Sequence, residues 1–220
     1  QKTPVWALGL FGFLFVVGFL TWAAAGASLP VSGLLIGTLG ISVPLIFGAL
    51  GGVISERAGV VNVAIEGQLL AGAFVAAVVA SVTRQPLLGL AAAMIAGVLV
   101  SFVLAAFSIR YLVDQVIVGV VLNVLVIGLT SFLFSTLLAP NAELLNSPPR
   151  FPRLPIPLLS EIPIIGPVLF RQTVIIYAMY FAVAVVWFAL FKTRWGLRLR
   201  SVGEHPQAAD KHRHLGHSER

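Results

Sequence analysis

The sequence has no cysteine and few charged residues, and both features restrict what the protein does. Without cysteine it forms neither a disulfide nor a thiolate metal site. Charged residues make up 10% of the chain, whereas a soluble domain carries about 25%. The mean hydropathy of +1.01 agrees with this deficit. A soluble core does not account for such a composition, so the sequence predicts an integral membrane protein.

Residues for nucleotide hydrolysis and for histidine chemistry are also missing. The lysines are Lys2, Lys192 and Lys211, and none stands in the G-x-x-x-x-G-K-[ST] pattern that holds phosphates. No histidine lies in an apolar run, which argues against a Ser–His or His–metal enzyme in the membrane. Three histidines lie in the polar tail, residues 211–220, which we expect to be disordered. The sequence therefore predicts no catalytic residue, no metal and no cofactor.

Six apolar runs are long enough to cross a bilayer, which takes about 20 residues. They are Val5–Ala25, Val31–Ile54, Val60–Val82, Leu87–Phe107, Val113–Ala139 and Thr173–Phe191. Pro44 lies inside the second run and is expected to kink it. The first run could be read as a signal peptide, but it exceeds the apolar length of about 7–15 residues typical of one. The predicted fold is an all-α, polytopic transmembrane bundle of about six spans.

Basic residues next to the runs predict the orientation, since they favour the cytoplasmic side. With the N-terminus inside, the inner flanks hold Lys2, Arg57, Arg110 and a cluster from Lys192 to Arg200. Both termini are therefore predicted to be cytoplasmic. Because the basic residues sit in these short flanks, the net charge of +6 does not indicate a nucleic-acid partner.

The same topology places residues 140–172 outside as a proline-rich loop. It contains eight of the thirteen prolines, a density that no long helix tolerates. Its stretch Ile156–Phe170 is still apolar, so we expect it to lie on the membrane surface or against the bundle. It could receive an external partner or form a stiff cap without one.

Small residues recur at four-residue spacing in several runs, which lets helix backbones approach closely. In the fourth run these residues are Gly89, Ala93, Gly97, Ser101 and Ala105, and in the third they are Gly72, Ala76 and Ala80. The second run repeats the pattern at Gly33 and Gly37 and at Gly48 and Gly52. The pattern indicates a tightly packed bundle and no particular function.

Few polar residues occur within the runs, and these are the candidates for a solute path. Asn62 and Glu66 are spaced i,i+4 and would share one face of a helix, as would Gln115 and Asn123 with Gly119 between them. Such residues line a path in some membrane proteins. In others they form interhelical hydrogen bonds worth about 0.6 kcal/mol each. Glu66 could instead pair with Arg57 or cap a neighbouring helix, and the sequence leaves these readings open.

The segment Gly196–Asp210 follows the last run on the predicted cytoplasmic side. Gly203 offers a turn, and Pro206 suits the first position of a short helix. Such a helix could be a handle for a cytoplasmic partner. A plain basic linker fits the residues equally well.

Two segments carry a resemblance to a known family. The stretch ISERAGVVNVAIEGQLLAGAF (Ile54–Phe74) and the stretch GLRLRSVGEHPQAAD (Gly196–Asp210) resemble permease subunits of bacterial ABC importers for branched-chain amino acids, simple sugars and nucleosides. The nucleoside and simple-sugar type is most similar, through a run S-E-R-x-G-V-x-N-x-x-x-E-G. Here this run consists of Ser55, Glu56, Arg57, Gly59, Val60, Asn62, Glu66 and Gly67.

The resemblance implies a permease of the bacterial inner membrane that supplies only the solute path. Its implied partners are an ABC ATPase, a second permease subunit, and an extracytoplasmic binding protein or lipoprotein. It also implies that residues 192–210 dock on the ATPase. The implied coupling residues are Gly196, Arg198, Arg200, Gly203, Glu204 and Pro206.

The chain departs from the family pattern after Asp210, where family members continue with further membrane helices. Here KHRHLGHSER follows, and we expect a permease domain over residues 1–210 that is truncated or frame-shifted. Two other functions stay open: an ion- or proton-coupled carrier that uses Glu66, and a structural membrane subunit without a solute. The sequence does not distinguish nucleosides from sugars.

Overall fold

The computed structural model describes residues 5–23, 31–163 and 165–204, and most of these lie in helices. The long helices are α1 (Val5–Ala23), α2 (Val31–Arg57), α3 (Ile65–Thr83), α4 (Pro86–Ala105), α5 (Gln115–Leu133) and α8 (Val174–Lys192). Two π-helical turns continue them, η1 (Ala106–Arg110) after α4 and η2 (Phe134–Leu138) after α5. The short elements are α6 (Ala142–Leu145), β1 (Arg153–Pro155), η3 (Leu159–Glu161), α7 (Ile165–Leu169), β2 (Arg171–Thr173) and α9 (Arg194–Glu204).

These helices confirm the all-α polytopic fold. Within the described ranges, five helical segments are long and apolar enough to cross a membrane: α2, α3, α4 with η1, α5 with η2, and α8. The first predicted span corresponds to α1, whose described apolar part, Gly9–Ala23, is shorter. The cytoplasmic placement of both termini stays a prediction.

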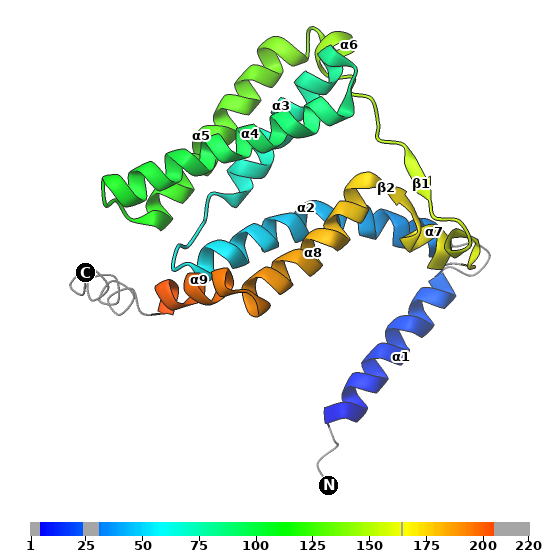
Figure 1. Cartoon of the computed structure of the whole chain (residues 1–220). Helices are drawn as coiled ribbons and strands as arrows, with labels where there is room; N and C mark the ends of the chain where they lie inside the picture. The colour runs from blue at the N-terminus through cyan, green and yellow to red at the C-terminus, as the bar shows by residue number, and fades with distance from the viewer. Residues whose placement is uncertain (1–4, 24–30, 164, 205–220) are drawn as a thin grey trace.

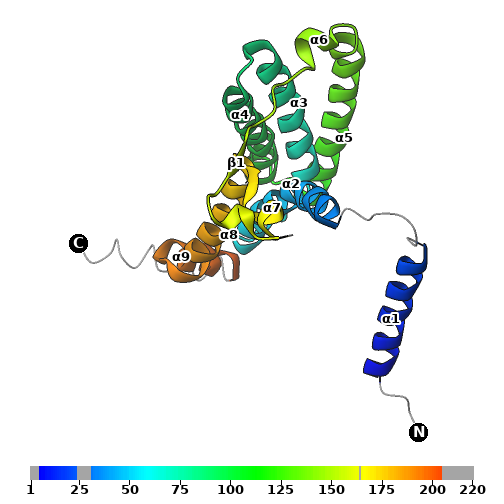
Figure 2. The ribbon, with the colours of Figure 1, turned by 90° about the vertical axis from the view of Figure 1, so that its right-hand side faces the viewer.

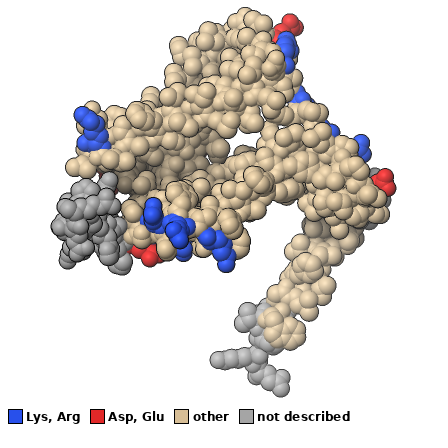
Figure 3. All heavy atoms as spheres, viewed as in Figure 1, with Lys and Arg blue, Asp and Glu red and all other residues tan. Residues whose placement is uncertain are grey.

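The helices form two layers, and α1 extends away from both (Figure 1). α3, α4 and α5 make one layer, and α2 and α8 make the other, as the turned view in Figure 2 also shows. Two non-helical segments connect the layers at opposite ends: residues 58–64, which we call the first link, and residues 146–152, the second link (Figure 1). The space-filling view in Figure 3 shows the molecule hollowed between the layers.

The surface has the charge distribution of a membrane protein. On the face shown in Figure 3, charged side chains gather at the ends of the helices, and the surface along them is uncharged. Large apolar side chains are exposed along the helices, for example Phe102 at 70% on α4 and Phe132 at 62% on α5. A soluble monomer rarely exposes so much continuous apolar surface, so lipid or other subunits cover it.

Small residues bring α3 and α4 into close contact, as their spacing predicts. A Cβ added to Gly89 would lie 2.7 Å from the Cβ of Ala80 and 2.9 Å from the carbonyl oxygen of Ala76. One added to Gly72 would lie 3.4 Å from the carbonyl oxygen of Ala93. Gly97 is different, because an added Cβ there would meet nothing within 4 Å. The ridge of α4 therefore packs on α3 over only part of its length.

Across its described residues, 140–163 and 165–172, the proline-rich segment contains no long helix, as predicted. Its strands pair antiparallel, with Leu154 opposite Gln172. The side chain of Gln172 is 3% exposed, and its Nε2 donates to the carbonyls of Pro167 (3.1 Å) and Val168 (2.7 Å) near the end of α7. Since α7 packs against α2, the apolar part of this segment lies on the bundle.

Two local predictions are wrong. The third span begins at Ile65 and not at Val60, so Asn62 precedes the helix and does not share a helical face with Glu66. Gly203 makes no turn, because it lies in the last turn of α9. In both places a contact with a distant part of the chain replaces the expected local structure. Pro206 and the predicted tail, residues 211–220, lie outside the described residues.

Candidate functional site

The first link begins with a left-handed turn at the end of α2. Gly59 has a φ of +83°, a conformation that glycine adopts without strain. The amide of Val60 donates to the carbonyl of Ser55 (2.9 Å), and the amide of Gly59 donates to that of Glu56 (3.0 Å). This pair of bonds is the Schellman motif, which closes the end of a helix. It ends α2 within the S-E-R-x-G run.

Side-chain amides of α5 bind the backbone of the first link. The Oε1 of Gln115 accepts from the amide of Val61 at 2.9 Å. The Nδ2 of Asn123 donates to the carbonyl of Val63 at 2.9 Å, and its Oδ1 accepts from the amide of Gly67 at 2.7 Å. Buried backbone groups that lack helical partners must find other ones, and these two side chains supply them.

Glycines make room for this contact. A Cβ on Gly119, which lies between Gln115 and Asn123 on α5, would be 2.8 Å from the Cβ of Val63. A Cβ on Gly67 would be 2.8 Å from the Oδ1 of Asn123. Ala64, at the end of the link, is fully buried in a cluster with Leu104, Val118 and Leu122. The predicted stripe on α5 therefore faces the first link.

Asn62 stabilises the link from within. Its Oδ1 accepts from the amide of Ala64 at 3.1 Å. Its Nδ2 donates to the Oε1 of Gln68, at 3.2 Å, on the first turns of α3. Asn62 thus orders the approach to α3, which has no side-chain cap on its own N-cap residue, Ala64.

Among the candidate path residues, Glu66 lines a cavity in the described part of the chain. It is exposed in the first turn of α3, where a carboxylate is favoured by the positive end of the helix dipole. The cavity is a groove of about 660 Å³ between α2 and α3. Its lining comprises Leu45, Gly48, Ala49, Gly52, Val53, Glu56, Ile65, Glu66 and Leu69. The groove is therefore apolar except for two carboxylates.

The glycines of α2 set the width of this groove. A Cβ added to Gly48 would lie 3.3 Å from the Cγ2 of Ile65, and one added to Gly52 would lie 3.2 Å from its Cδ1. In the structure Arg57 contacts Phe191 and not Glu66, the partner that the sequence allowed. Its guanidinium lies over the ring of Phe191, 6.0 Å from the centroid.

The predicted coupling segment folds into α9 and packs against the end of α2. Gly196 is buried where the chain turns from α8, and an added Cβ would overlap the carbonyls of Ala189 and Leu190. Arg200 lies over the ring of Phe191 at 5.3 Å, so this ring contacts cations from α2 and α9. Arg198 and Glu204 are exposed.

Gly203 forms the closest approach between α9 and α2. An added Cβ would overlap the carbonyl oxygen of Arg57 and lie 3.0 Å from the amide nitrogen of Gly59. A Cβ on Gly59 would in turn lie 3.3 Å from the Cα of Gly203. Two residues of separate motifs thus meet through their backbones.

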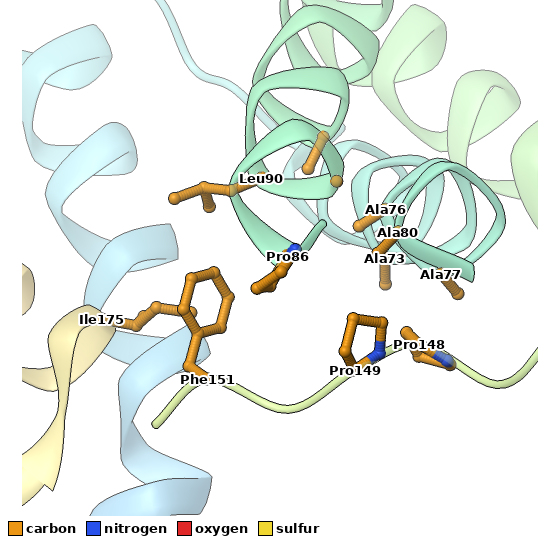
Figure 4. A pocket seen from close by; sticks show the side chains of 12 residues that line it. Ala73, Ala76, Ala77, Ala80, Pro86, Leu90, Pro148, Pro149, Phe151 and Ile175 are labelled. Atoms are coloured by element: carbon orange, nitrogen blue, oxygen red, sulfur yellow. The ribbon is translucent and has the colours of Figure 1, made fainter. Parts of the chain in front are cut away.

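The second link is bound by different residues. The Oγ of Ser81, which is fully buried on α3, accepts from the amide of Ser147 at 2.9 Å. Arg84 donates to the carbonyl of Ser147 at 3.3 Å. Beyond it the link borders an apolar cavity of about 290 Å³ between α3, α4 and α8. Figure 4 shows Pro149 beneath the alanines of α3 and Phe151 near Ile175.

Sequence reasoning missed several of these residues. A glycine directly after a helix is a known signal for its end, so Gly59 could have been assigned. Phe191 and Ser81 carry no comparable signal, because an aromatic residue or a serine in an apolar run is usually ordinary packing. Their partners lie far away in the sequence.

The fold and these contacts define a polytopic helical membrane protein. The connection between α2 and α3 is not helical, and at Gly59 it packs against α9, the short helix that follows α8. Residues 34–211 match the family model described as branched-chain amino acid transport system / permease component. Because this match covers most of the chain, the protein belongs to that family. It is a multi-pass protein of the plasma membrane.

Relatives support this assignment. The chain is 43% identical over 180 residues to the guanosine ABC transporter permease protein NupQ of Bacillus subtilis, a match covering 79% of this chain and 56% of that protein. It is 40% identical over 177 residues to the nucleoside ABC transporter permease protein NupC of Lactococcus lactis, covering 77% and 55%. A Haloferax volcanii protein named provisionally as the glucose ABC transporter permease TsgC13 is 37% identical over 183 residues, covering 81% and 54%.

The chain therefore spans about half the length of the curated relatives it matches. No solved structure matches it.

Proposed function

We propose that the chain is the permease subunit of an ATP-driven importer for nucleosides or simple sugars. The observation that carries this proposal is the 43% identity over 180 residues to a guanosine permease protein. The names of the other two relatives add nucleosides and glucose. In this proposal the chain forms part of the solute path and a separate ATPase subunit supplies energy. The lack of a phosphate-binding loop in the sequence agrees with that division.

Two surfaces suit the partners of such a subunit. α9 exposes Trp195, Leu197 and Val202 as well as Arg198 and Glu204, a mixed surface on which an ATPase would dock. The segment 140–172 would receive an extracytoplasmic binding protein or lipoprotein. A second permease subunit would complete the path.

Of the four candidate path residues, we assign Glu66 to the path itself, because it lines the groove between α2 and α3. Its carboxylate accepts hydrogen bonds from hydroxyl groups, which both nucleosides and sugars present. Asn62, Gln115 and Asn123 act indirectly, since their hydrogen bonds hold the link that precedes Glu66.

Uptake of labelled guanosine and glucose tests the proposal, in cells that express the permease with its ATPase and binding protein. Arsenate depletes ATP and a protonophore collapses the proton gradient, so the two treatments separate the energy sources. We expect arsenate to stop uptake and the protonophore to leave most of it. Uptake that survives ATP depletion but stops with the protonophore would replace this proposal with a proton-coupled carrier.

Variants of Glu66 sharpen the same test. Glu66→Leu should lower uptake by about tenfold or more, as for one lost charged hydrogen bond. Glu66→Gln should retain much of it, because an amide oxygen still accepts from a hydroxyl group. The control is Ser135→Ala, at an exposed position on η2 whose hydroxyl bonds to the carbonyl of Phe132 one turn earlier. If Glu66→Leu transports normally, Glu66 is not in the path.

A further inference from the structure

The strongest unassigned feature is the continuous contact from α9 to α5. It begins at Gly203, whose Cα leaves no room for a side chain against the carbonyl of Arg57 and the amide of Gly59. The ring of Phe191 adds a second contact, since Arg57 and Arg200 both lie over it, at 6.0 Å and 5.3 Å. α9 therefore cannot shift relative to the end of α2 without moving Gly59 or breaking these contacts.

Gly59 passes this contact into the first link. The left-handed turn at Gly59 is closed by two backbone hydrogen bonds, so it moves as a unit with the end of α2. Val61 follows two residues later, and its amide is bound by Gln115 at 2.9 Å. Val63 follows after two more, and its carbonyl is bound by Asn123 at 2.9 Å.

The link then ends at Glu66, in the groove between α2 and α3. Asn123 also accepts from the amide of Gly67 at 2.7 Å, so the start of α3 and α5 are joined by one side chain. A short segment bound at both ends transmits a displacement, whereas a free loop would absorb it. Interfaces packed this tightly have discrete arrangements and are not continuously deformable.

We infer that the first link is the mechanical connection by which α9 controls the groove at Glu66, with Gly203 and Gly59 as positioning residues. This inference rests on the proposed function, because it takes an ATPase docked on α9 as the source of the displacement. Docking of an ATPase on α9 does not by itself specify how a displacement reaches the groove. The inference adds that route, which runs from α9 to the end of α2 and through the first link to α3 and α5. Gly203 is required as glycine because any side chain would separate the two backbones.

Single thiols test this route, because the chain has no cysteine of its own. One is placed on α9 by Leu197→Cys, at a side chain that is 61% exposed. The other is placed in the first link by Val61→Cys, at one that is 49% exposed. Each variant of the permease is reconstituted with its ATPase in vesicles, and the rate of maleimide labelling is measured with and without a non-hydrolysable ATP analogue.

We expect the analogue to change the labelling rates of both thiols several-fold when Gly203 is present. With Gly203→Ala, the Leu197→Cys thiol should still respond, whereas the response of the Val61→Cys thiol should fall by about tenfold, within the usual range of coupling between sites. Gly97→Ala is the control, because an added Cβ there meets nothing within 4 Å. It should leave both responses unchanged.

The outcomes separate the inference from the proposed function. If the analogue changes the labelling rate of the Val61→Cys thiol as much with Gly203→Ala as with Gly203, the route through Gly203 is wrong, while the docking of the ATPase on α9 is not contradicted. If the Leu197→Cys thiol responds in no variant, no ATPase acts on α9, and both the docking and this route are wrong.

Gln115 provides a second variant that leaves α9 and both glycines untouched. Gln115→Leu removes the acceptor for Val61, whereas Gln115→Glu keeps an oxygen in its place. We expect Gln115→Leu to lower the solute moved per ATP hydrolysed by about tenfold with hydrolysis retained, and Gln115→Glu to restore it. Equal coupling in the two variants would overturn the role of this hydrogen bond in the link.

Discussion

The first and second links connect the same two layers, but their backbones are held in different ways. Two amide side chains of one helix, Gln115 and Asn123 on α5, bind the first link at two points, Val61 and Val63, and Asn123 also binds Gly67 at the start of α3. A serine and an arginine at the far end of α3, Ser81 and Arg84, bind the second at Ser147. The first link also contains a left-handed glycine, whereas the second contains the adjacent prolines 148 and 149.

The difference indicates that the first link transmits a displacement between the layers, whereas the second link restrains them. Proline fixes its own φ and restricts the residue before it, so the second link is stiff whatever its contacts. The first link owes its conformation to hydrogen bonds with α5 and to the space left by Gly119 and Gly67. Its stability therefore depends on distant side chains, and substitutions there should have larger effects than substitutions at the second link.

The largest effect is expected for Asn123→Leu. It leaves the carbonyl of Val63 and the amide of Gly67 without their partner. Each unsatisfied group costs about 1–3 kcal/mol, so the variant should lose about 2–6 kcal/mol of stability. Thermal unfolding in detergent measures it. Asn123→Asp keeps the acceptor for Gly67 and should lose less, and Asn141→Ala is the control at an exposed amide. Equal unfolding temperatures for Asn123→Leu and Asn141→Ala would contradict the comparison.

Gly119→Ala should have an intermediate effect. Its new Cβ would lie 2.8 Å from the Cβ of Val63 and must push the first link away from α5. Overpacking of this kind typically costs about 1–3 kcal/mol. The matched control on the same helix is Gly128→Ala, where nothing lies within 4 Å. That variant should be unchanged or gain up to about 1 kcal/mol from the better helix propensity of alanine. Thermal unfolding in detergent measures the stability of both variants. Equal unfolding temperatures for Gly119→Ala and Gly128→Ala would mean that the first link has room to move away from α5.

The smallest effect is expected at the second link, for Ser81→Ala. It removes the acceptor for the amide of Ser147, and the remaining contacts and the prolines should keep the link in place. The cost should be about 1 kcal/mol, that of one hydrogen bond. Ser101→Ala is the control, since its hydroxyl bonds only to the carbonyl of Gly97 on its own helix. A loss at Ser81 larger than at Asn123 would reverse the ranking of the two links.

Much of the fold follows from local sequence, as particular elements show. The apolar runs from Leu87 and Thr173 correspond to α4 and α8 with ends shifted by three residues or fewer. The alanine and glycine spacing of α3 and α4 correctly indicated close packing at Gly72 and Gly89. Asp114, the second residue of the fifth run, caps α5 and accepts from the amide of Val116 at 2.8 Å.

The candidate site was less accessible from sequence. The spacing of Gln115, Gly119 and Asn123 identified one side of α5 but not what it faces, because the partner, Val63, lies 60 residues earlier. Asn62 was predicted to lie in a helix because the residues around it are apolar and because Asn62 and Glu66 are four residues apart. The structure instead ends α2 at Arg57, and the hydrogen bonds lost between there and Ile65 are replaced by bonds from α5.

The sequence by itself determined that this is a multi-span membrane protein of the permease family, because hydropathy and the two motifs depend only on neighbouring residues. Only the tertiary structure decided that those motifs meet at Gly59 and Gly203, and that the polar side chains of α5 hold a non-helical link. The physical reason is that backbone groups without helical partners take whichever donors and acceptors the packing brings near, and packing joins residues that are far apart in the chain.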